Sequence, residues 1–341
     1  MKRILLLSLL FSLFSLNYAQ DKSGNYLTVG FYNVENLFDT LDDPRINDEE
    51  FLPASEKEWN AEKYSQKLKN LGRVINLMGK SGAPEILGLC EVENLGVITD
   101  LVQELKSENE YKIAHYDSPD GRGIDAALVY AGNLFTLENL LQHEVFLPDL
   151  YPTRTILHAV LKYKNGELYH FFVNHWPSRR GGQDESVVNR ISAATSLRVV
   201  VDALFEEDPN SNIIIMGDFN DEPADTSISY ILQANNYLCD STGNVVNNAL
   251  YNLSYKLKES GYGTYKYREN WNMLDQIMVS GSLARGEGRG YICGTFTIFK
   301  PDFILQTEGN YKGTSLPTFG GKRYFGGYSD HFSIFALFNF D

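Results

Sequence analysis

Two polar residues follow a continuous apolar run in the second half of the chain. The segment 213–216 (Ile-Ile-Ile-Met) is typical of a buried strand, and Gly217 permits a close backbone approach at its end. Asp218 and Asn220 come next at i and i+2, so their side chains should point the same way. Their oxygens suit a divalent cation that holds a phosphate. The alternative is a strand that leaves the core through a polar turn.

Residues of the same kind lie at the ends of other predicted strands. They follow strands at Asn33, Glu35, Glu91 and His175, and they precede strands at Asp275, Asp330 and His331. If the two sets of strands run antiparallel, all these side chains gather on one rim with Asp218 and Asn220. Such a rim is the geometry of an active site at a sheet edge.

The chemistry of this set is coherent. Four carboxylates, those of Glu91, Asp218, Asp275 and Asp330, would repel one another without a cation. Oxygen ligands select Mg²⁺ or Mn²⁺ over zinc. Two histidines and no thiolate nucleophile suit a single-step attack of water on phosphorus, with the cation polarising the phosphoryl oxygens. An aspartate beside one histidine would set its tautomer.

In this order the motifs resemble those of the endonuclease/exonuclease/phosphatase superfamily, and the chain looks like a secreted bacterial member. The resemblance extends from Asn33 to His331. It is carried by Asn33-Val34-Glu35, Glu91, Asn174-His175, Gly217-Asp218-Phe219-Asn220, Leu274-Asp275 and Ser329-Asp330-His331. It implies a deoxyribonuclease I-like fold: two mixed or antiparallel sheets packed as a sandwich and flanked by helices, in four α-β-β-α layers.

The resemblance also implies a role for each residue. Glu91 would be the main ligand of Mg²⁺ or Mn²⁺, supported by Asn33, Glu35 and Asp330. Asp218 and Asn220 would orient the attacking water and the scissile phosphate. His331, paired with Asp275, would act as general base or phosphate stabiliser, and His175 would stabilise the phosphorane or protonate the leaving group.

The expected substrate is a phosphodiester, with nucleic acid as the first choice. Arg122 lies between two glycines at a strand entrance, and a basic loop follows His175. We expect substrate contacts from Arg122, Asn174, Trp176, Arg179 and Arg180, with Trp176 stacking on a base. The alternatives are a phosphatase or sphingomyelinase-like esterase acting on lipid or sugar phosphates and, more remotely, a non-catalytic binding module.

The elements that must position these residues alternate in type. Apolar spacing of 3.6 residues predicts helices over 64–78, 95–105 and 186–205. Strands are predicted over 26–32, 86–90, 124–130, 155–163, 168–173, 276–280 and 332–338, with Asn165-Gly166 as a hairpin turn. The segment 235–270 is rich in Asn, Tyr and Gly and is predicted to form loops and turns. No internal repeat or linker is evident, which favours one domain over 20–341.

The amino-terminal sequence indicates the compartment in which the protein acts. Residues 1–19 have the basic start and short apolar body of a signal peptide, which predicts a secreted or periplasmic protein; an uncleaved anchor is the alternative. The mature chain contains no predicted transmembrane segment.

The cysteines and the charge limit the chemistry further. Cys90, Cys239 and Cys293 allow at most one disulfide within the chain. The formal charge of −14 repels polyanions, so nucleic-acid binding would depend on local basic residues and cations. We expect a monomer without a stable protein partner.

Overall fold

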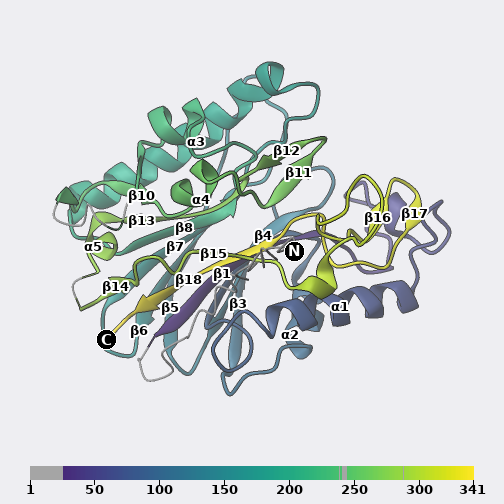
Figure 1. The fold of residues 1–341 in the computed structure, drawn as a ribbon, viewed down its shortest axis with the longest axis horizontal. Coiled ribbons are helices and arrows are strands. Elements are labelled where there is room, and N and C mark those ends of the chain that lie inside the picture. Colours follow the sequence, from purple (N-terminus) through teal and green to yellow (C-terminus); the bar gives the residue numbers. More distant parts are fainter. Residues whose placement is uncertain (1–25, 238, 240–243, 287) are drawn as a thin grey trace, which may run out of the picture.

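Two β-sheets lie face to face in the computed structural model, with helices on both outer sides (Figure 1). The structure describes residues 26–237, 239, 244–286 and 288–341, so the predicted signal peptide at 1–19 lies outside the described residues. Helix α3 (Gln183–Glu207) covers one sheet, and α1 (Ala61–Ile75) and α2 (Leu95–Gln103) cover the other. The predicted four-layer α/β architecture is confirmed.

The first sheet brings strand ends of opposite polarity to one rim. It consists of β1 (Leu27–Leu37), β2 (Ile86–Val92), β3 (Tyr111–His115), β4 (Asp125–Ala131), β14 (Gly290–Tyr291), β15 (Thr297–Phe299) and β18 (Ser333–Asn339). The order is β14-β18-β1-β2-β4-β3, with β15 also paired to β18. Because β1 is parallel to β2 and antiparallel to β18, the carboxyl ends of β1 and β2 adjoin the amino end of β18.

The second sheet repeats this arrangement. It consists of β5 (Phe135–His143), β6 (Ile156–Tyr163), β7 (Leu168–His175), β8 (Ile213–Asp218), β9 (Ala234–Asn236), β10 (Leu250–Asn252) and β13 (Asp275–Ser280). The order is β5-β6-β7-β8-β13-β10-β9. β7 and β8 are parallel and β13 is antiparallel to β8, so the ends of β7 and β8 meet the start of β13.

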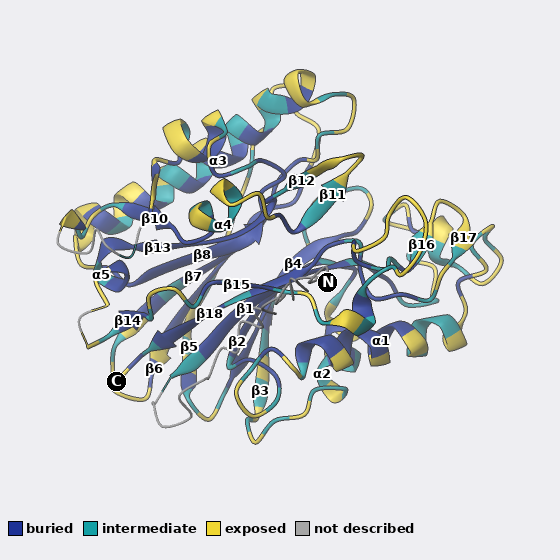
Figure 2. Ribbon diagram, in the orientation of Figure 1, coloured by how far each residue is buried: buried dark blue, intermediate teal, exposed yellow. Residues whose placement is uncertain are grey.

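Apolar side chains from both sheets form a common core. Phe31, Val129, Val173 and Ile277 belong to it and are fully buried. The sheets approach closely at Gly88, where a Cβ would lie 2.6 Å from Met216 Sδ. Figure 2 shows the strands as largely buried and the outer helix faces as exposed. The core therefore holds the two rims in fixed positions relative to each other.

The helices begin where the sequence places capping residues. Asn60 accepts a hydrogen bond from Lys63 N–H at the start of α1, and Asn94 accepts one from Val97 N–H at the start of α2. All three predicted helices form, with shifts of up to three residues at their ends. Among the residues that the structure describes, no helix combines the length and the apolar character needed to cross a bilayer.

The prediction of only loops and turns over 235–270 is wrong in part. This segment contains β10, the short helix α4 (Tyr255–Glu259) and β11 (Tyr265–Tyr267), which forms a hairpin with β12 (Asn270–Asn272). These strands are too short to show an alternating pattern. Pairing with β13 stabilises β10, and neither its partner nor its register is visible in the local sequence.

The remaining elements are short. They are η1 (Glu49–Phe51), η2 (Ser227–Ile231), α5 (Gly281–Ala284), η4 (Asp302–Ile304), and the hairpin of β16 (Phe319–Gly320) with β17 (Arg323–Tyr324). The hairpin lies at one end of the molecule, beside α1 (Figure 1).

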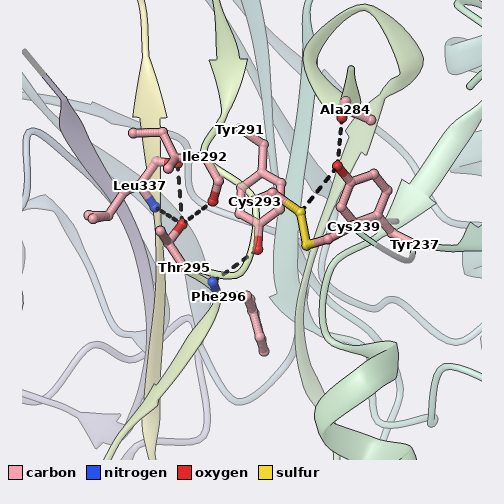
Figure 3. Close-up of a disulfide and its surroundings, with 9 residues drawn as sticks. All are labelled: Tyr237, Cys239, Ala284, Tyr291, Ile292, Cys293, Thr295, Phe296 and Leu337. Atoms are coloured by element: carbon pink, nitrogen blue, oxygen red, sulfur yellow. Dashed lines mark hydrogen bonds between the residues drawn. A yellow bond between two sulfur atoms is a disulfide. The ribbon is translucent and has the colours of Figure 1, made fainter. Parts of the chain in front are cut away.

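One disulfide joins the two sheets at their edges. Cys239 follows β9, the edge strand of the second sheet, and Cys293 follows β14, an edge strand of the first (Figure 3). Tyr237 donates its hydroxyl to Ala284 O at 2.7 Å beside this bond. Cys90 is free and buried, so the expectation of at most one disulfide is confirmed.

Candidate active site

Glu91 lies on a bulge near the end of β2. The pairing with β4 shifts register between Cys90 and Val92, and Glu91 has a φ of 62°. This left-handed backbone is unfavourable for a residue with a Cβ, and such strain is concentrated at functional sites. Asn33 Nδ2 donates to Glu91 Oε1 at 3.2 Å, and Asn36 N–H donates to Oε2 at 2.9 Å. The Glu91 carboxylate is therefore held against β1.

Asp218 connects the rims of the two sheets. It pairs with Asp275 across β8 and β13, and with His175 across β7 and β8. Its Oδ2 atom accepts a hydrogen bond from Asn33 Nδ2 at 3.1 Å. Because Asn33 belongs to the first sheet and Asp218 to the second, this bond closes the rim across the sandwich.

His331 is held by an aspartate on its buried side. Its Nδ1 atom lies 2.7 Å from Asp275 Oδ2, and its Nε2 atom lies 3.9 Å from Asp218 Oδ2. Burial by itself lowers the pKa of His331, but Asp275 and Asp218 outweigh that effect and raise the pKa well above its ordinary value. The imidazole is therefore cationic at neutral pH in the metal-free protein, with Nδ1–H directed to Asp275.

His175 has the opposite electrostatics. Its Nε2 atom lies 3.7 Å from Glu91 Oε1 and 3.9 Å from Asp218 Oδ2. Burial, followed by the charges of Arg154 and Arg122, lowers the pKa of His175 well below its ordinary value. The ring is therefore neutral, and one rim contains a charged and an uncharged imidazole.

The carboxylates of the rim are crowded. Burial raises the pKa of Asp218 to about 6, and Asp275 adds to the shift. Burial raises the pKa of Asp330 to about 7, with contributions from Glu35 and Glu91. Excess negative charge of this kind is relieved by a bound cation.

The donor set fits a hard divalent ion. Oxygens of Asp218 and Asp275 and a ring nitrogen of His331 lie within 4.8 Å of one another, and Asp275 Oδ1 is buried without a hydrogen-bond partner among the described residues. His331 is a poor ligand because it is cationic and engaged by Asp275. The carboxylates are the groups that such an ion would contact, because Asn33 directs its Nδ2 atom to Glu91 and Asp218 while its Oδ1 atom accepts the N–H of Glu35 at 3.0 Å.

A cavity of about 670 Å³ opens above this rim. Its walls come from the loop between β7 and α3 and from the β11–β12 hairpin. The lining residues are Glu91, Arg122, His175, Ser178, Arg179, Arg180, Gly181, Gly182, Gln183, Asp218, Asn220, Tyr265, Tyr267, Asn270, Asn272, Leu274, Asp330 and His331. Four of the five predicted catalytic residues thus share one cavity with the three predicted arginines, and the fifth, Asp275, lies behind His331.

The three arginines differ in how free their side chains are. Arg122 is half exposed and lies 3.5 Å from Asp120, and Arg180 is exposed. Arg179 is engaged by the protein: its Nε donates to Asn220 O at 2.7 Å, and it pairs with Asp225 at 2.9 Å. Arg122 and Arg180 are therefore better placed to meet a substrate.

The expectation that Trp176 stacks on a base is wrong. The ring is 1% exposed and packs edge-on against Phe219 with centroids 4.8 Å apart. Its Nε1 atom donates to Asn174 Oδ1 at 3.1 Å, and Asn174 is itself fully buried. Because Asn174 has no exposed surface, it cannot make the predicted contact with a substrate in this structure. Gly217 is needed here because a Cβ would lie 2.4 Å from Asn174 O.

Asn220 and Glu35 are both held by backbone groups. Asn220 has a φ of 51°, and it donates from its backbone to Asp218 Oδ1 at 2.9 Å and from Nδ2 to Trp176 O at 3.0 Å. The Glu35 carboxylate accepts the N–H of Thr318 at 2.6 Å and that of Phe319 at 3.3 Å. Glu35 thus anchors the segment that leads into the β16–β17 hairpin.

Sequence reasoning missed two groups near the cavity. Tyr265 lies with its ring centroid 4.8 Å from that of His331, on a hairpin without a periodic signal. Arg154 is buried, pairs with Asp120 at 2.7 Å, and donates to His175 O at 3.2 Å and Trp176 O at 2.8 Å. Nothing in the neighbouring sequence marks Arg154, because its role depends on chain segments that are distant in sequence.

Comparisons with known proteins agree with this fold. The sequence model of the endonuclease/exonuclease/phosphatase family matches residues 28–339, while no curated protein matches. A solved structure of a family protein from Bacteroides thetaiotaomicron is similar, with 17% identity, a TM-score of 0.54 and coverage of 93% of this chain and 98% of that chain.

Two further solved structures share the fold. Truncated TDP2 from Caenorhabditis elegans has 18% identity and a TM-score of 0.55, with coverage of 93% of this chain and 99% of that chain. A mannosyl-6-phosphatase from Bacteroides thetaiotaomicron has 16% identity and a TM-score of 0.52, with coverage of 92% and 100%. The match along nearly all of the described residues shows that the chain belongs to the endonuclease/exonuclease/phosphatase family, whose members are metal-dependent hydrolases of phosphoester bonds.

Proposed function

We propose that this protein is a secreted phosphodiesterase that hydrolyses nucleic acid with Mg²⁺ or Mn²⁺, through in-line attack of water on phosphorus. The observation that carries the proposal is the convergence of Glu91, Asp218, Asp275 and His331 below one cavity. These side chains come from both sheets and form a buried, acidic floor with a single cationic imidazole. Such a floor suits a cation and an anionic phosphate at the same time.

The proposed ligands of the cation are Glu91 and Asp330, with Asn33 beside them. A divalent ion bound there would offset the carboxylates and polarise the phosphoryl oxygens. Glu35 supports this group indirectly, since its carboxylate is occupied by the N–H groups of Thr318 and Phe319.

The histidines and Asp218 have separate roles in this proposal. His331 is cationic and held by Asp275, so its Nε2–H donates to a phosphate oxygen as negative charge develops. Asp218 accepts a proton from the attacking water, because its pKa of about 6 matches a base that works near neutral pH. Neutral His175 donates to the phosphorane. Asn220 restrains Asp218 through its backbone N–H.

Binding of a nucleic-acid strand is supported by groups on the cavity wall. Arg122 and Arg180 line the cavity and can meet phosphates, and the exposed ring of Tyr267 together with Tyr265 offers a surface on which a base can stack. The tyrosines replace Trp176 in this role. The net charge of −14 predicts moderate affinity with strong dependence on salt.

A sugar-phosphate phosphatase is the second candidate. The acidic surface and the cavity of about 670 Å³, walled by a hairpin and a loop, favour a compact phosphoester over a long duplex. Export is supported by the amino-terminal pattern and by the Cys239–Cys293 disulfide, since such bonds persist in oxidising compartments. We propose that the mature chain, 20–341, is one domain and acts as a monomer.

The test is hydrolysis by residues 20–341 in Mg²⁺ or EDTA. The substrates are plasmid DNA, single-stranded DNA, RNA, bis-p-nitrophenyl phosphate and mannose 6-phosphate. Cation-dependent cleavage of a polynucleotide, lost in Glu91→Gln and kept in the exposed control Glu138→Gln, supports the nuclease proposal. Turnover of mannose 6-phosphate alone would replace it with the phosphatase. Equal activity in Glu91→Gln would contradict the assigned site.

A further inference from the structure

A second cavity lies behind the loop that carries Arg122. This outer cavity has a volume of about 240 Å³ and is lined by Asp43, Arg45, Ile46, Glu93, Asn94, 117–121, Gly123 and Asp125. Arg122 lines the catalytic cavity, whereas Gly121 and Gly123 on either side of it line the outer one. The loop therefore separates the two cavities.

His115, Asp117 and Asp125 form a compact group at the outer cavity. One ligand atom from each lies within 4.8 Å of the others, and His115 Nε2 lies 2.9 Å from Asp125 Oδ2. His115 pairs with Ala127 across β3 and β4, so it shares a sheet face with Asp125, two residues away. Two ligands bonded at about 2.1 Å to one tetrahedral ion lie about 3.4 Å apart, so this hydrogen-bonded pair would need to separate by only about half an ångström.

The negative charge at the outer cavity exceeds the nearby positive charge. Asp43 pairs with Arg45 and Asp120 pairs with Arg154, at 2.6 Å and 2.7 Å. Among the described residues, the remaining carboxylates of the lining have no Lys or Arg partner: Glu93, Asp117 and Asp125. Asp117 is exposed, whereas Glu93 and Asp125 are buried, and buried carboxylates without a cationic partner call for a cation or a proton.

Glu93 gives independent support for a ligand. Its side chain lines the outer cavity but is only 6% exposed. Within the described part of the chain, its Oε2 accepts one hydrogen bond, from Asp39 N–H at 2.7 Å, and Oε1 accepts none. This buried carboxylate lines the cavity with one oxygen free of hydrogen bonds, so it can meet a ligand there.

We propose that His115, Asp117 and Asp125 bind a divalent transition metal, Zn²⁺ or Mn²⁺, at the outer cavity, with Glu93 facing the same ion or its water. An imidazole with carboxylates selects these ions over Mg²⁺ and Ca²⁺, which prefer oxygen ligands alone. His115 binds through the lone pair of Nε2, in place of its hydrogen bond to Asp125.

The ion would join three segments of the chain. His115 ends β3, Asp117 belongs to the loop, and Asp125 begins β4. Asp125 Oδ1 already accepts the N–H of Ser118 at 2.7 Å. Metal binding would therefore close the loop over 116–124 at both ends, behind the wall of the catalytic cavity.

The test is calorimetric titration of a Glu91→Gln background, which weakens the proposed catalytic ion. Zn²⁺ and Mn²⁺ are titrated separately in the presence of excess Mg²⁺. One equivalent should bind, and Asp117→Asn and His115→Gln should each weaken it at least tenfold. Asp117 is exposed, so Asp117→Asn leaves the fold intact. His143→Gln, which alters another partly buried histidine of a sheet, should leave the affinity unchanged.

A second readout is thermal unfolding with and without Zn²⁺. The metal should raise the melting temperature of the Glu91→Gln protein but not that of Glu91→Gln with Asp117→Asn. Absence of stoichiometric binding, equal affinity in the Asp117→Asn variant, or displacement of the ion by Mg²⁺ would overturn the proposal. His115 and Asp125 would then form only a hydrogen-bonded pair.

Discussion

The rim with the proposed catalytic residues and the disulfide-linked edge of the same sandwich are built in opposite ways. At the rim, carboxylates crowd together, and Glu91 and Asn220 have left-handed backbone with φ of 62° and 51°. At the edge, Cys239–Cys293 joins the sheets, and Tyr237 packs against Tyr291 with ring centroids 5.6 Å apart. Strain and repulsion are concentrated where chemistry is proposed, and a covalent link with aromatic packing stabilises the other region.

This contrast teaches that stability and activity can be altered separately here. Relieving repulsion at the rim should stabilise the protein while abolishing activity. Opening the edge should destabilise the protein while leaving the chemistry intact.

The largest expected effect is that of Glu91→Gln. Loss of the principal carboxylate for the cation should lower kcat/KM by about 10³-fold or more. The free energy of unfolding in EDTA should stay equal or rise, because one negative charge leaves a crowded site. Steady-state kinetics and urea unfolding measure the two effects. If Glu91→Gln were inactive because it is less stable, the contrast between the rim and the disulfide-linked edge would not hold.

The next effect is loss of the disulfide. Cys239 and Cys293 are 54 residues apart, and closing a loop of that length stabilises the folded state by about 4 kcal/mol in the chain-entropy picture. Cys239→Ser with Cys293→Ser should therefore lower the free energy of unfolding by about 2–4 kcal/mol. Its kcat at 20 °C should match that of the unaltered protein. A tenfold fall in kcat would show that the edge also shapes the site.

A smaller effect should appear in the pH dependence of the metal-free protein. The pKa of Asp330 is raised to about 7 in the folded state, so folding favours its protonated form. As the pH rises from the pKa of Asp330 in the unfolded chain to pH 7, the unfolded state loses this proton before the folded state does. The free energy of unfolding therefore falls over this range. Asp330→Asn should stabilise the protein more at pH 8 than at pH 5, as measured by urea unfolding in EDTA. An equal gain at both pH values would contradict the raised pKa.

The smallest effect is expected from Arg180→Ala. Arg180 is exposed on the cavity wall, so removing its charge should raise KM for a polynucleotide about 2- to 5-fold with kcat unchanged. The increase should vanish at high salt. Arg289→Ala removes a partly exposed charge near β14, paired with Glu167, and serves as the control. Equal shifts in both variants would mean that only net charge matters.

The sequence by itself determined the elements whose patterns are local. Long apolar runs such as 213–216 predicted the central strands, and helical periodicity with capping residues predicted α1 to α3. Polar residues at strand ends predicted which side chains would share a rim, because strand polarity carries every end of one kind to one edge. Family membership followed from the order of the same residues.

Only the tertiary structure decided which of these side chains are accessible and what else surrounds them. Trp176 is buried in a cluster with α3 and Phe219, and Asn174 is buried against Trp176 and Met216; no local pattern shows this cover. The β11–β12 hairpin reaches the site through the contact of Tyr265 with His331, and Arg154 through its bonds to Asp120 and His175, all between segments distant in sequence. The pairing of Cys239 with Cys293 likewise required the two sheet edges to meet. Local patterns encode elements, whereas burial and long-range contacts arise only when those elements pack.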